Sequence, residues 1–442
     1  MRHDSQSPRP PGRIKRFAAN LTLFFYGTQL LSSCVPAGSP SNEGNSAEVV
    51  RARAALDTIP FELRPDTILA TTSATPEAPG ITPFTANVTA NGSAAVSIPL
   101  WVPPGRAGIQ PSLSIVYDSQ GSDGLLGPGF NLAGLSQITL CPNSFARDGI
   151  LQAVDFRHWL LPSDNQVFDF YKRVYCLDGA RLAPAGTRAF KLEQDAYATI
   201  RIPDSNMPAN PETFEVRGRD GLIRTYGRAT TVQGASRDDA LLRGFHRGFK
   251  RETVDDVFGT GIFETGNIET TDSGVATITW ALASIKDRFG NQMDVYYDQA
   301  PAVDATSVAW HRPSRIVYSS FRGDAVDPEP GSTPVTAEDG RREVTFEYES
   351  RPDTFTGYLS GVKVGRDFRL SRINMKGPGL SPGGNTVSTV LLRSYKLQYH
   401  PGAVSRRSLL TELRECDGRD VCKTPIRFDW EQGSWDFDYM PA

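Results

Sequence analysis

The sequence predicts an all-β protein, with many short antiparallel strands in a large twisted sheet or partial β-shell and little helix. The chain contains 40 glycines and 32 prolines in 442 residues. Short runs such as "SLSIVYDS" and "EVTFEYES" alternate apolar and polar residues, as strands with one buried face do. Separators such as "RDG" and "DRFGN" combine residues that favour turns. Because no helical crossovers separate the runs, we expect neighbouring strands to be antiparallel.

Composition and charge narrow the class of protein. Apolar residues make up 39% of the chain and charged residues 22%, which is typical of a globular protein. The formal net charge is −3, so there is no basic excess to bind nucleic acid. No exact repeat recurs at a fixed period, and a regular propeller or solenoid is therefore not predicted.

The first 33 residues have the layout of an export signal of the lipoprotein type. A basic stretch reaches Arg16, and the apolar run "FAANLTLFFYGTQLLSSC" that follows is short for a membrane span. Its last four letters resemble a bacterial lipoprotein cleavage box, in which lipidated Cys34 becomes the first mature residue. We expect an exported protein, either lipid-anchored in the cell envelope or extracellular. A signal peptide cut elsewhere and an uncleaved anchor are alternatives.

The remainder divides into a linker and one large domain. Residues 34–80 are rich in Pro, Ser, Ala and Thr and predict a flexible linker, whereas residues 81–442 predict a single β-rich domain. Two stretches interrupt the strand pattern. Residues 230–274 predict a short helix or a long functional loop, and residues 321–342 predict another exposed loop.

Four cysteines remain if Cys34 carries lipid, and an even number in an oxidising compartment allows full disulfide pairing. Cys416 and Cys422 flank the turn "DGRDV", which makes a local bridge reasonable, and pairing of Cys141 with Cys176 follows by elimination. Zinc is the competing interpretation. The CxxC spacing is absent and no histidine neighbours either pair, so no metal is predicted.

The densest glycine and proline pattern lies in residues 98–142, "IPLWVPPGRAGIQPSLSIVYDSQGSDGLLGPGFNLAGLSQITLCP", here called the signature segment. Within it, Pro103 and Pro104 stiffen the chain, while Gly105 and Gly108 permit conformations closed to other residues. Arg106 is held between the glycines, where it is placed to bind a carboxylate or carbonyls. An anion-binding nest is an alternative, but the GxxxxGKS pattern is absent.

The signature segment resembles the SpvB-like N-terminal domain, which Salmonella virulence plasmid B protein shares with the B component of insecticidal toxin complexes, relatives of Rhs/YD-repeat shell proteins. Further matches follow in order and extend the resemblance over about residues 81 to 435. They include "VYCLDGARL", "FEVRGRDGLIRTYG", "WALASIKDRFGNQMDVYY", "RPSRIVY", "VTFEYESRPD" and "LLTELRECDGRDVCKTPIRFDW".

The resemblance implies a structural domain that forms part of a hollow shell around a toxic polypeptide and is not itself a catalyst. It implies a protein partner and no cofactor. Family members usually continue into further shell regions, so the sheet edges of this chain are expected to need covering by a partner or by self-association. A remnant of a longer gene is a third alternative.

Searching the sequence for an active site gives only weak candidates. Glu347–Glu349, "EYE", superficially resembles the glutamate pair of ADP-ribosyltransferases, but alternation places its two glutamates on the wet face of a strand. No GxSxG elbow is present. The turn Asp118–Gly124 offers oxygen ligands without the spacing of a calcium loop. The other candidates are scattered histidines and acidic pairs: His158, His246, His311, His400, Asp238 with Asp239, and Asp255 with Asp256.

We therefore predict a non-enzymatic scaffold linked to virulence or toxin delivery, with no catalytic, cofactor or metal residues. A surface-binding lipoprotein that recognises glycan or protein through residues 230–274 is the main alternative. A toxin enzyme, associated with an ADP-ribosyltransferase domain that this sequence does not contain, is a further alternative. Six tryptophans are expected mostly in packing.

Overall fold

A computed structural model describes residues 77–142, 144–148, 174–186, 188–193, 197–203, 211–247, 250–251, 268–269, 273–321, 340–359, 361–380 and 387–431. These residues are almost entirely β, which confirms the predicted fold class. The described helical pieces are one 3₁₀ turn, η1 (Arg106–Gly108), and one short helix, α2 (Phe145–Asp148). No described helix is long and apolar enough to cross a membrane.

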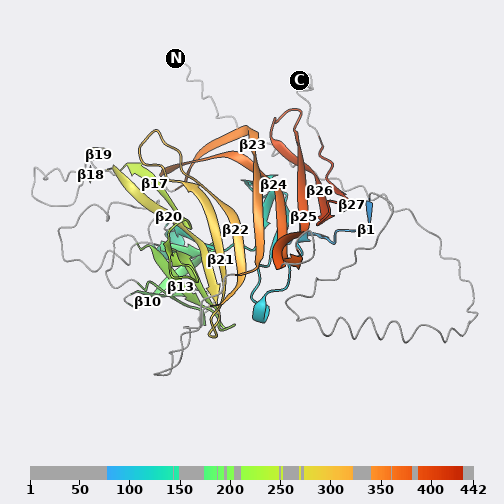
Figure 1. Cartoon of the computed structure of the whole chain (residues 1–442). Helices are drawn as coiled ribbons and strands as arrows, with labels where there is room; N and C mark the ends of the chain where they lie inside the picture. The colour runs from blue at the N-terminus through green and yellow to red at the C-terminus, as the bar shows by residue number, and fades with distance from the viewer. Residues whose placement is uncertain are drawn as a thin grey trace, which may run out of the picture.

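A curved wall of long antiparallel strands forms the front of the molecule (Figure 1). Each strand pairs with the next along the chain. The strands are β21 (Asn291–Ala300), β22 (Trp310–Phe321), β23 (Arg342–Leu359), β24 (Val362–Leu380), β25 (Val387–Pro401) and β26 (Ser408–Asp417). The short strands β27 (Cys422–Thr424) and β28 (Ile426–Arg427) continue the wall beyond β26.

The outer edge of the wall is a strand from the other end of the chain. β1 (Glu77–Ile81) runs parallel to β27, with Glu77 opposite Cys422 and Ile81 opposite Thr424. In Figure 1 it lies at the right-hand end of the wall. Residues 77–80 were assigned to the linker from sequence, but they belong to β1.

A smaller antiparallel sheet, here called the inner sheet, packs on the wall. It has the order β2 (Thr85–Val88), β3 (Ala94–Pro99), β4 (Ser114–Asp118) and β7 (Phe130–Ala133), so most of it comes from the signature segment. The hairpin of β5 (Asp123–Gly124) and β6 (Gly127–Pro128) connects β4 to β7.

Beside the wall, eight strands pair in a closed ring in which the last strand meets the first. In ring order they are β8 (Gln137–Cys141), β9 (Val174–Leu177), β10 (Ala180–Gly186), β11 (Ala189–Leu192), β12 (Thr199–Arg201), β13 (Thr213–Arg217), β14 (Ile223–Gly227) and β20 (Ser273–Lys286). The ring and wall share β20, because its C-terminal end also pairs with β21.

Aromatic side chains fill the ring. Tyr175, Phe190, Phe214 and Trp280 are buried, and their neighbouring ring centroids lie 5.0 to 5.7 Å apart in edge-to-face contacts. Such pairs stabilise a core beyond the area they bury. The indole Nε1 of Trp280 donates to the carbonyl of Pro211 at 2.6 Å, which satisfies the polar group of this buried side chain.

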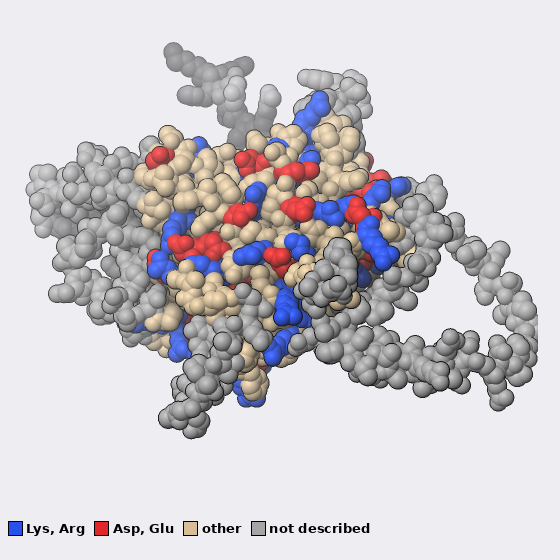
Figure 2. Space-filling view, viewed as in Figure 1, with Lys and Arg blue, Asp and Glu red and all other residues tan. Residues whose placement is uncertain are grey.

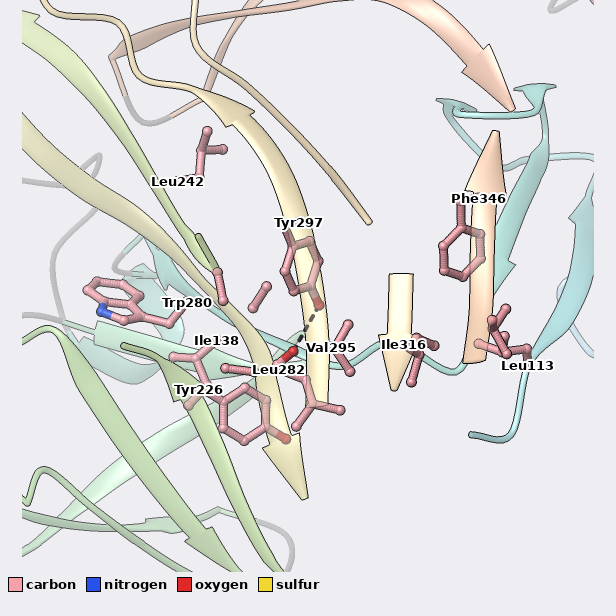
Figure 3. Packing of buried hydrophobic residues seen from close by; sticks show 14 of the residues in the cluster. Leu113, Ile138, Tyr226, Leu242, Trp280, Leu282, Val295, Tyr297, Ile316 and Phe346 are labelled. Carbon is pink, nitrogen blue, oxygen red and sulfur yellow. Dashed lines mark hydrogen bonds between the residues drawn. The ribbon is translucent and has the colours of Figure 1, made fainter. Parts of the chain in front are cut away.

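One core runs without interruption from the ring to the wall. Figure 3 shows Trp280 and Ile138 of the ring beside Tyr297 of β21, with Ile316 and Phe346 of the next two strands following. The hydroxyl of buried Tyr297 donates to the carbonyl of Leu282 at 3.0 Å, the dashed line in the figure. The ring, the wall and the inner sheet therefore pack around a single hydrophobic core.

The stretch at residues 230–274 differs from its prediction as a helix or loop. Its described part contains the strand β17 (Leu241–Arg247), which pairs along its whole length with β20. The charged residues of this stretch obscured the strand pattern, although Leu241 and Leu242 are both buried. Two short hairpins lie nearby: β15 (Ala229–Thr230) with β16 (Ser236–Arg237), and β18 (Lys250–Arg251) with β19 (Ile268–Glu269).

Candidate functional site: the signature segment on the β wall

The proline-glycine motif of the signature segment docks on the end of β22. The hydroxyl of Tyr318 donates to the carbonyl of Pro103 at 2.8 Å, and the Arg106 amide donates to Ser319 Oγ at 3.2 Å. The guanidinium of Arg106 lies 4.8 Å from the centre of the Phe321 ring. The motif thus contacts the Phe321 ring and the Ser319 hydroxyl, and these contacts join the segment to the wall.

The two glycines of this motif serve different purposes. Gly108 has a φ of +79°, which glycine adopts without strain. Gly105 has an ordinary φ, but a Cβ at this position would lie 1.9 Å from the carbonyl oxygen of Ile109. Pro104, between the motif's two fixed ends, is exposed. At Gly105, therefore, the backbone of the motif passes too close to the backbone of Ile109 to leave room for a side chain.

A second contact holds the start of the signature segment against β25. The amide of Trp101 donates to the hydroxyl of Tyr395 at 2.8 Å, and Arg393 stacks 4.3 Å from the Trp101 ring centre. Arg393 also pairs at 2.6 Å with Glu415, whose side chain is only 3% exposed. Thr82 donates to the same carboxylate at 2.9 Å, which links the chain just after β1 to the wall.

A buried ion cluster anchors the middle of the segment. The Arg351 side chain is fully buried, and its Nη2 lies 3.1 Å from Asp123 and 2.7 Å from Asp353. Asp353 also accepts hydrogen bonds from the amide and hydroxyl of Ser408. Burial acts to raise the pKa of Asp353, but the hydrogen bonds from Arg351 and Ser408 hold it well below its usual value. β5, β23 and β26 meet at this cluster.

The end of the segment is fastened to the ring. Asp178 accepts from the Ser136 hydroxyl at 2.5 Å and from the Gln137 amide at 2.8 Å. Ser136 Oγ is also 2.9 Å from the hydroxyl of Tyr226, a residue whose pKa is raised to about 12 by burial. The structure joins Cys141 of β8 to Cys176 of β9 by a disulfide.

The second disulfide joins Cys416 to Cys422, which lie opposite one another on β26 and β27. These sulfurs lie near the carboxylate of Asp420, within the reach of a shared metal ion. A sulfur committed to a disulfide does not serve as a thiolate ligand, and Asp420 pairs with Lys396 at 2.7 Å. Cys34, the predicted lipidation residue, lies outside the described residues.

The candidate catalytic groups are engaged in structural contacts. Val344 and Phe346 of β23 face the core, whereas Glu347 and Glu349 are exposed, as the alternation predicts. Glu347 accepts from Asn374 at 2.5 Å, and Glu349 pairs with Arg369 at 2.6 Å. Nothing about their positions distinguishes these glutamates from other residues on the wet face of the wall.

The other acidic candidates are similarly engaged. Asp118 accepts from Ser93 and from the amide of Gln120, and Asp123 belongs to the ion cluster of Arg351. Asp238 pairs with Arg243 at 2.8 Å, and Asp239 pairs with Arg237 at 2.9 Å. Asp255, Asp256, His158, Trp159 and Trp435 lie outside the described residues, as does the side chain of His246.

The two histidines whose side chains the structure describes, His311 and His400, lie in different environments. His400 is on β25, where its Nδ1 lies 2.9 Å from the carbonyl of Pro401. His311 is on β22, and burial lowers its pKa to about 4. The two are not brought together with an acid and a hydroxyl nucleophile. The described tryptophans are Trp101, Trp280, Trp310 and Trp430, and all are buried or partly buried.

The face of the wall opposite the inner sheet carries charges of both signs. Figure 2 shows Lys and Arg interspersed with Asp and Glu across this face. Ion pairs account for many of them, including the cross-strand pair of Glu343 with Lys376 at 3.4 Å and the pair of Arg372 on β24 with Asp420 in a turn at 3.4 Å. Each exposed pair stabilises little. This face is polar, unlike the core of an obligate interface.

The structure defines the class of protein: a β wall with an attached ring of strands and an inner sheet built from the signature segment. Residues 88–141 match the family model described as Salmonella virulence plasmid 65kDa B protein (SpvB). For these residues, the match confirms the resemblance stated from the sequence. No curated protein sequence matches the chain.

Solved structures share the fold. The crystal structure of TcdB2-TccC3 aligns with 79% of this chain and 17% of its own, with a TM-score of 0.53 and 14% identity. The crystal structure of TcdB2-TccC3-Cdc42 aligns with 76% of this chain and 16% of its own chain, with a TM-score of 0.50 and 15% identity. The structure of the N-terminal domain of effector protein SpvB from Salmonella typhimurium strain LT2 aligns with 72% of this chain and 98% of its own chain. Its TM-score is 0.46 and its sequence identity is 14%. The chain thus spans about a sixth of the TcdB2-TccC3 chain.

Proposed function

We propose that this protein is an exported, non-enzymatic scaffold that contributes a portion of β wall to a toxin-related or virulence-related assembly. The observation that carries the proposal is the use of the signature segment. Its polar groups anchor an inner sheet to the wall and ring through Tyr318, Arg351 and Asp178. Because these polar groups are engaged in contacts within the fold, we infer that the segment has a structural role.

A protein partner is supported by the open edge of the wall. β1 pairs with β27 on one side, and among the described strands no residue register pairs its other side. Ile81 at this edge is 68% exposed. An open edge with an exposed branched residue is a template for strand addition. The similar TcdB2-TccC3 structures contain two named components, which is consistent with a wall completed by partners.

Export is supported by the sequence of residues 1–34 and by the two disulfides, since such bonds persist in oxidising compartments. A lipid anchor at Cys34 would hold the wall at a membrane surface through the linker. An enzymatic role and a glycan-binding role through residues 230–274 have no supporting observation among the described residues.

Edge variants test the scaffold proposal. Tagged wild-type protein is purified from its native host beside Ile81→Lys, because a lysine at a sheet edge opposes strand addition. Val303→Lys is the matched control, since Val303 is similarly exposed, at 61%, but lies in the connection between β21 and β22. We expect Ile81→Lys to lose a stoichiometric partner that wild type and Val303→Lys retain. Recovery of wild type without any partner would overturn the proposal.

A further inference from the structure

A cavity of about 170 Å³ lies where the signature segment meets β20, β21 and β22. One part of its lining is apolar and the other carries hydrogen-bonding groups. The apolar residues are Leu125, Leu132, Leu135, Ala281 and Pro313, and the polar ones are Asn131, Ser136, Gln137, Tyr297 and His311. This combination of apolar wall and few polar groups is typical of small-molecule sites.

His311 lines this cavity, and one of its two ring nitrogens is engaged within the fold. Its Nε2 lies 3.2 Å from the carbonyl oxygen of Asp239. Because a carbonyl only accepts, Nε2 carries the proton, and burial keeps the ring neutral by lowering its pKa to about 4. Nδ1 is therefore an unprotonated acceptor. No residue in the described ranges donates a hydrogen bond to it.

Contacts with neighbouring residues fix the orientation of the His311 imidazole. Tyr297 stacks on it with ring centroids 4.3 Å apart and an interplanar angle of 16°. The Asp239 carboxylate accepts from the Tyr297 amide at 2.8 Å and from Arg237 at 2.9 Å, which fixes the carbonyl that orients His311. The acceptor is thus preorganised, which lowers the ordering cost of binding.

A second polar group is also available. The side-chain amide of Asn131, on β7, makes no hydrogen bond with any residue that the structure describes, and it lines the same cavity. Ser136, in contrast, is engaged with Asp178 and Tyr226. A ligand therefore meets an acceptor at His311 and an amide at Asn131 against a wall of leucines.

The volume sets the size of the group that this partly open cavity can take up. An apolar cavity of about 150 Å³ accommodates benzene, so about 170 Å³ suits one aromatic ring with a small substituent. We propose that this cavity binds a phenolic ring, whose apolar face contacts the leucines and whose hydroxyl donates to Nδ1 of His311. The ring comes from a free small phenol or from a tyrosine side chain of a polypeptide. This inference does not depend on the scaffold role.

The test compares p-cresol with toluene, which has the same ring and methyl group without the hydroxyl. Binding to the full chain is measured by ligand-observed NMR titration. We expect p-cresol to bind about three- to tenfold more tightly than toluene, the effect of one satisfied hydrogen bond. Equal affinities, or no binding of either compound, would overturn the proposal.

Two variants locate the effect. His311→Leu should remove the preference for p-cresol, whereas His400→Leu, which changes a histidine outside the cavity, should retain it. Leu132→Trp should block both compounds by filling the cavity while leaving His311 intact. Circular dichroism establishes that each variant is folded. A preference that survives both His311→Leu and Leu132→Trp would place binding elsewhere and contradict the proposal.

N-acetyltyrosinamide distinguishes the two sources of the ring. If it binds with the same dependence on His311 as p-cresol, the cavity accepts a tyrosine attached to a backbone. If p-cresol alone binds, the cavity is selective for a free phenol. Both results support a phenolic ligand and assign its origin.

Discussion

The buried guanidinium of Arg351 binds Asp123, a residue 228 positions earlier in the chain, with Nη2 to carboxylate distances of 3.1 and 3.2 Å. This pair joins the hairpin of the signature segment to the middle of the longest part of the wall. Arg351 Nη1 adds a hydrogen bond of 3.3 Å to the carbonyl of Gly124. This buried cation is therefore one of the contacts that hold the inner sheet on the wall.

Replacing Arg351 by Met should be strongly destabilising. The change leaves Asp353 without its cation and leaves Asp123 only the more distant Arg366, at 4.0 Å. Breaking a buried pair costs about 3 to 5 kcal/mol. Arg201→Met is the control, because Arg201 is 48% exposed and its pair with Glu215 should contribute less than about 1 kcal/mol. Urea unfolding monitored by tryptophan fluorescence measures both. Equal losses in the two variants would contradict the assigned role of Arg351.

Gly134 should tolerate alanine less well than Gly179 does. Both have positive φ, +104° and +82°, so each alanine carries backbone strain of about 1 to 2 kcal/mol. Only at Gly134 would the added Cβ also collide, 1.9 Å from the carbonyl oxygen of Ser112, whereas Gly179 faces open space. We expect a clearly lower melting temperature for Gly134→Ala than for Gly179→Ala. Similar melting temperatures would show that the backbones do not cross this closely.

The two disulfides should contribute unequally. Loop-closure entropy gives about 4 kcal/mol for the bridge across 35 positions, Cys141 to Cys176, and about 2 kcal/mol for the bridge across six, Cys416 to Cys422. Cys141→Ser should therefore cost more than Cys416→Ser in unfolding experiments on protein recovered from an oxidising compartment. If thermal stability is unchanged by reductant, neither bridge forms in that protein.

His311 should make stability depend on pH between about 6.5 and 4. Burial lowers its folded pKa to about 4, below the usual value, so the unfolded chain binds more protons in this window. Its contribution is complete above about pH 6.5 and lost as the pH falls, by about 2 to 3 kcal/mol at pH 4.5. Urea midpoints at several pH values should show this slope in wild type and His400→Gln. A slope of the same size in His311→Gln would assign it to other groups.

Local pattern was enough to predict the strands of the wall. In β23 the alternation placed Val344 and Phe346 inward and Glu347 outward, because a pleated strand with one wet face leaves that period in its sequence. The turn residues between strands were informative for the same reason. The strand Leu241–Arg247 was missed, since Arg243 and Arg247 resemble a solvated loop when the pairing with β20 is not known.

Contacts between residues that are far apart in the chain could not be predicted from the local sequence. Ring closure depends on pairing Thr139 with Thr279, and the sequence around neither residue specifies this pairing. The cavity around His311 was missed similarly, because its lining comes from two segments, Leu125–Gln137 and Ala281–Pro313, that are far apart in the chain. A lone histidine in an apolar strand gives no indication of which residues it will face.

The central claim is that this β wall serves as a scaffold for another protein. Native mass spectrometry of the protein, purified at low salt from the envelope of its native host, tests that claim most directly. The account predicts an assembly with a fixed stoichiometry of this chain and a partner polypeptide. A single mass corresponding to one copy of this chain alone would contradict it.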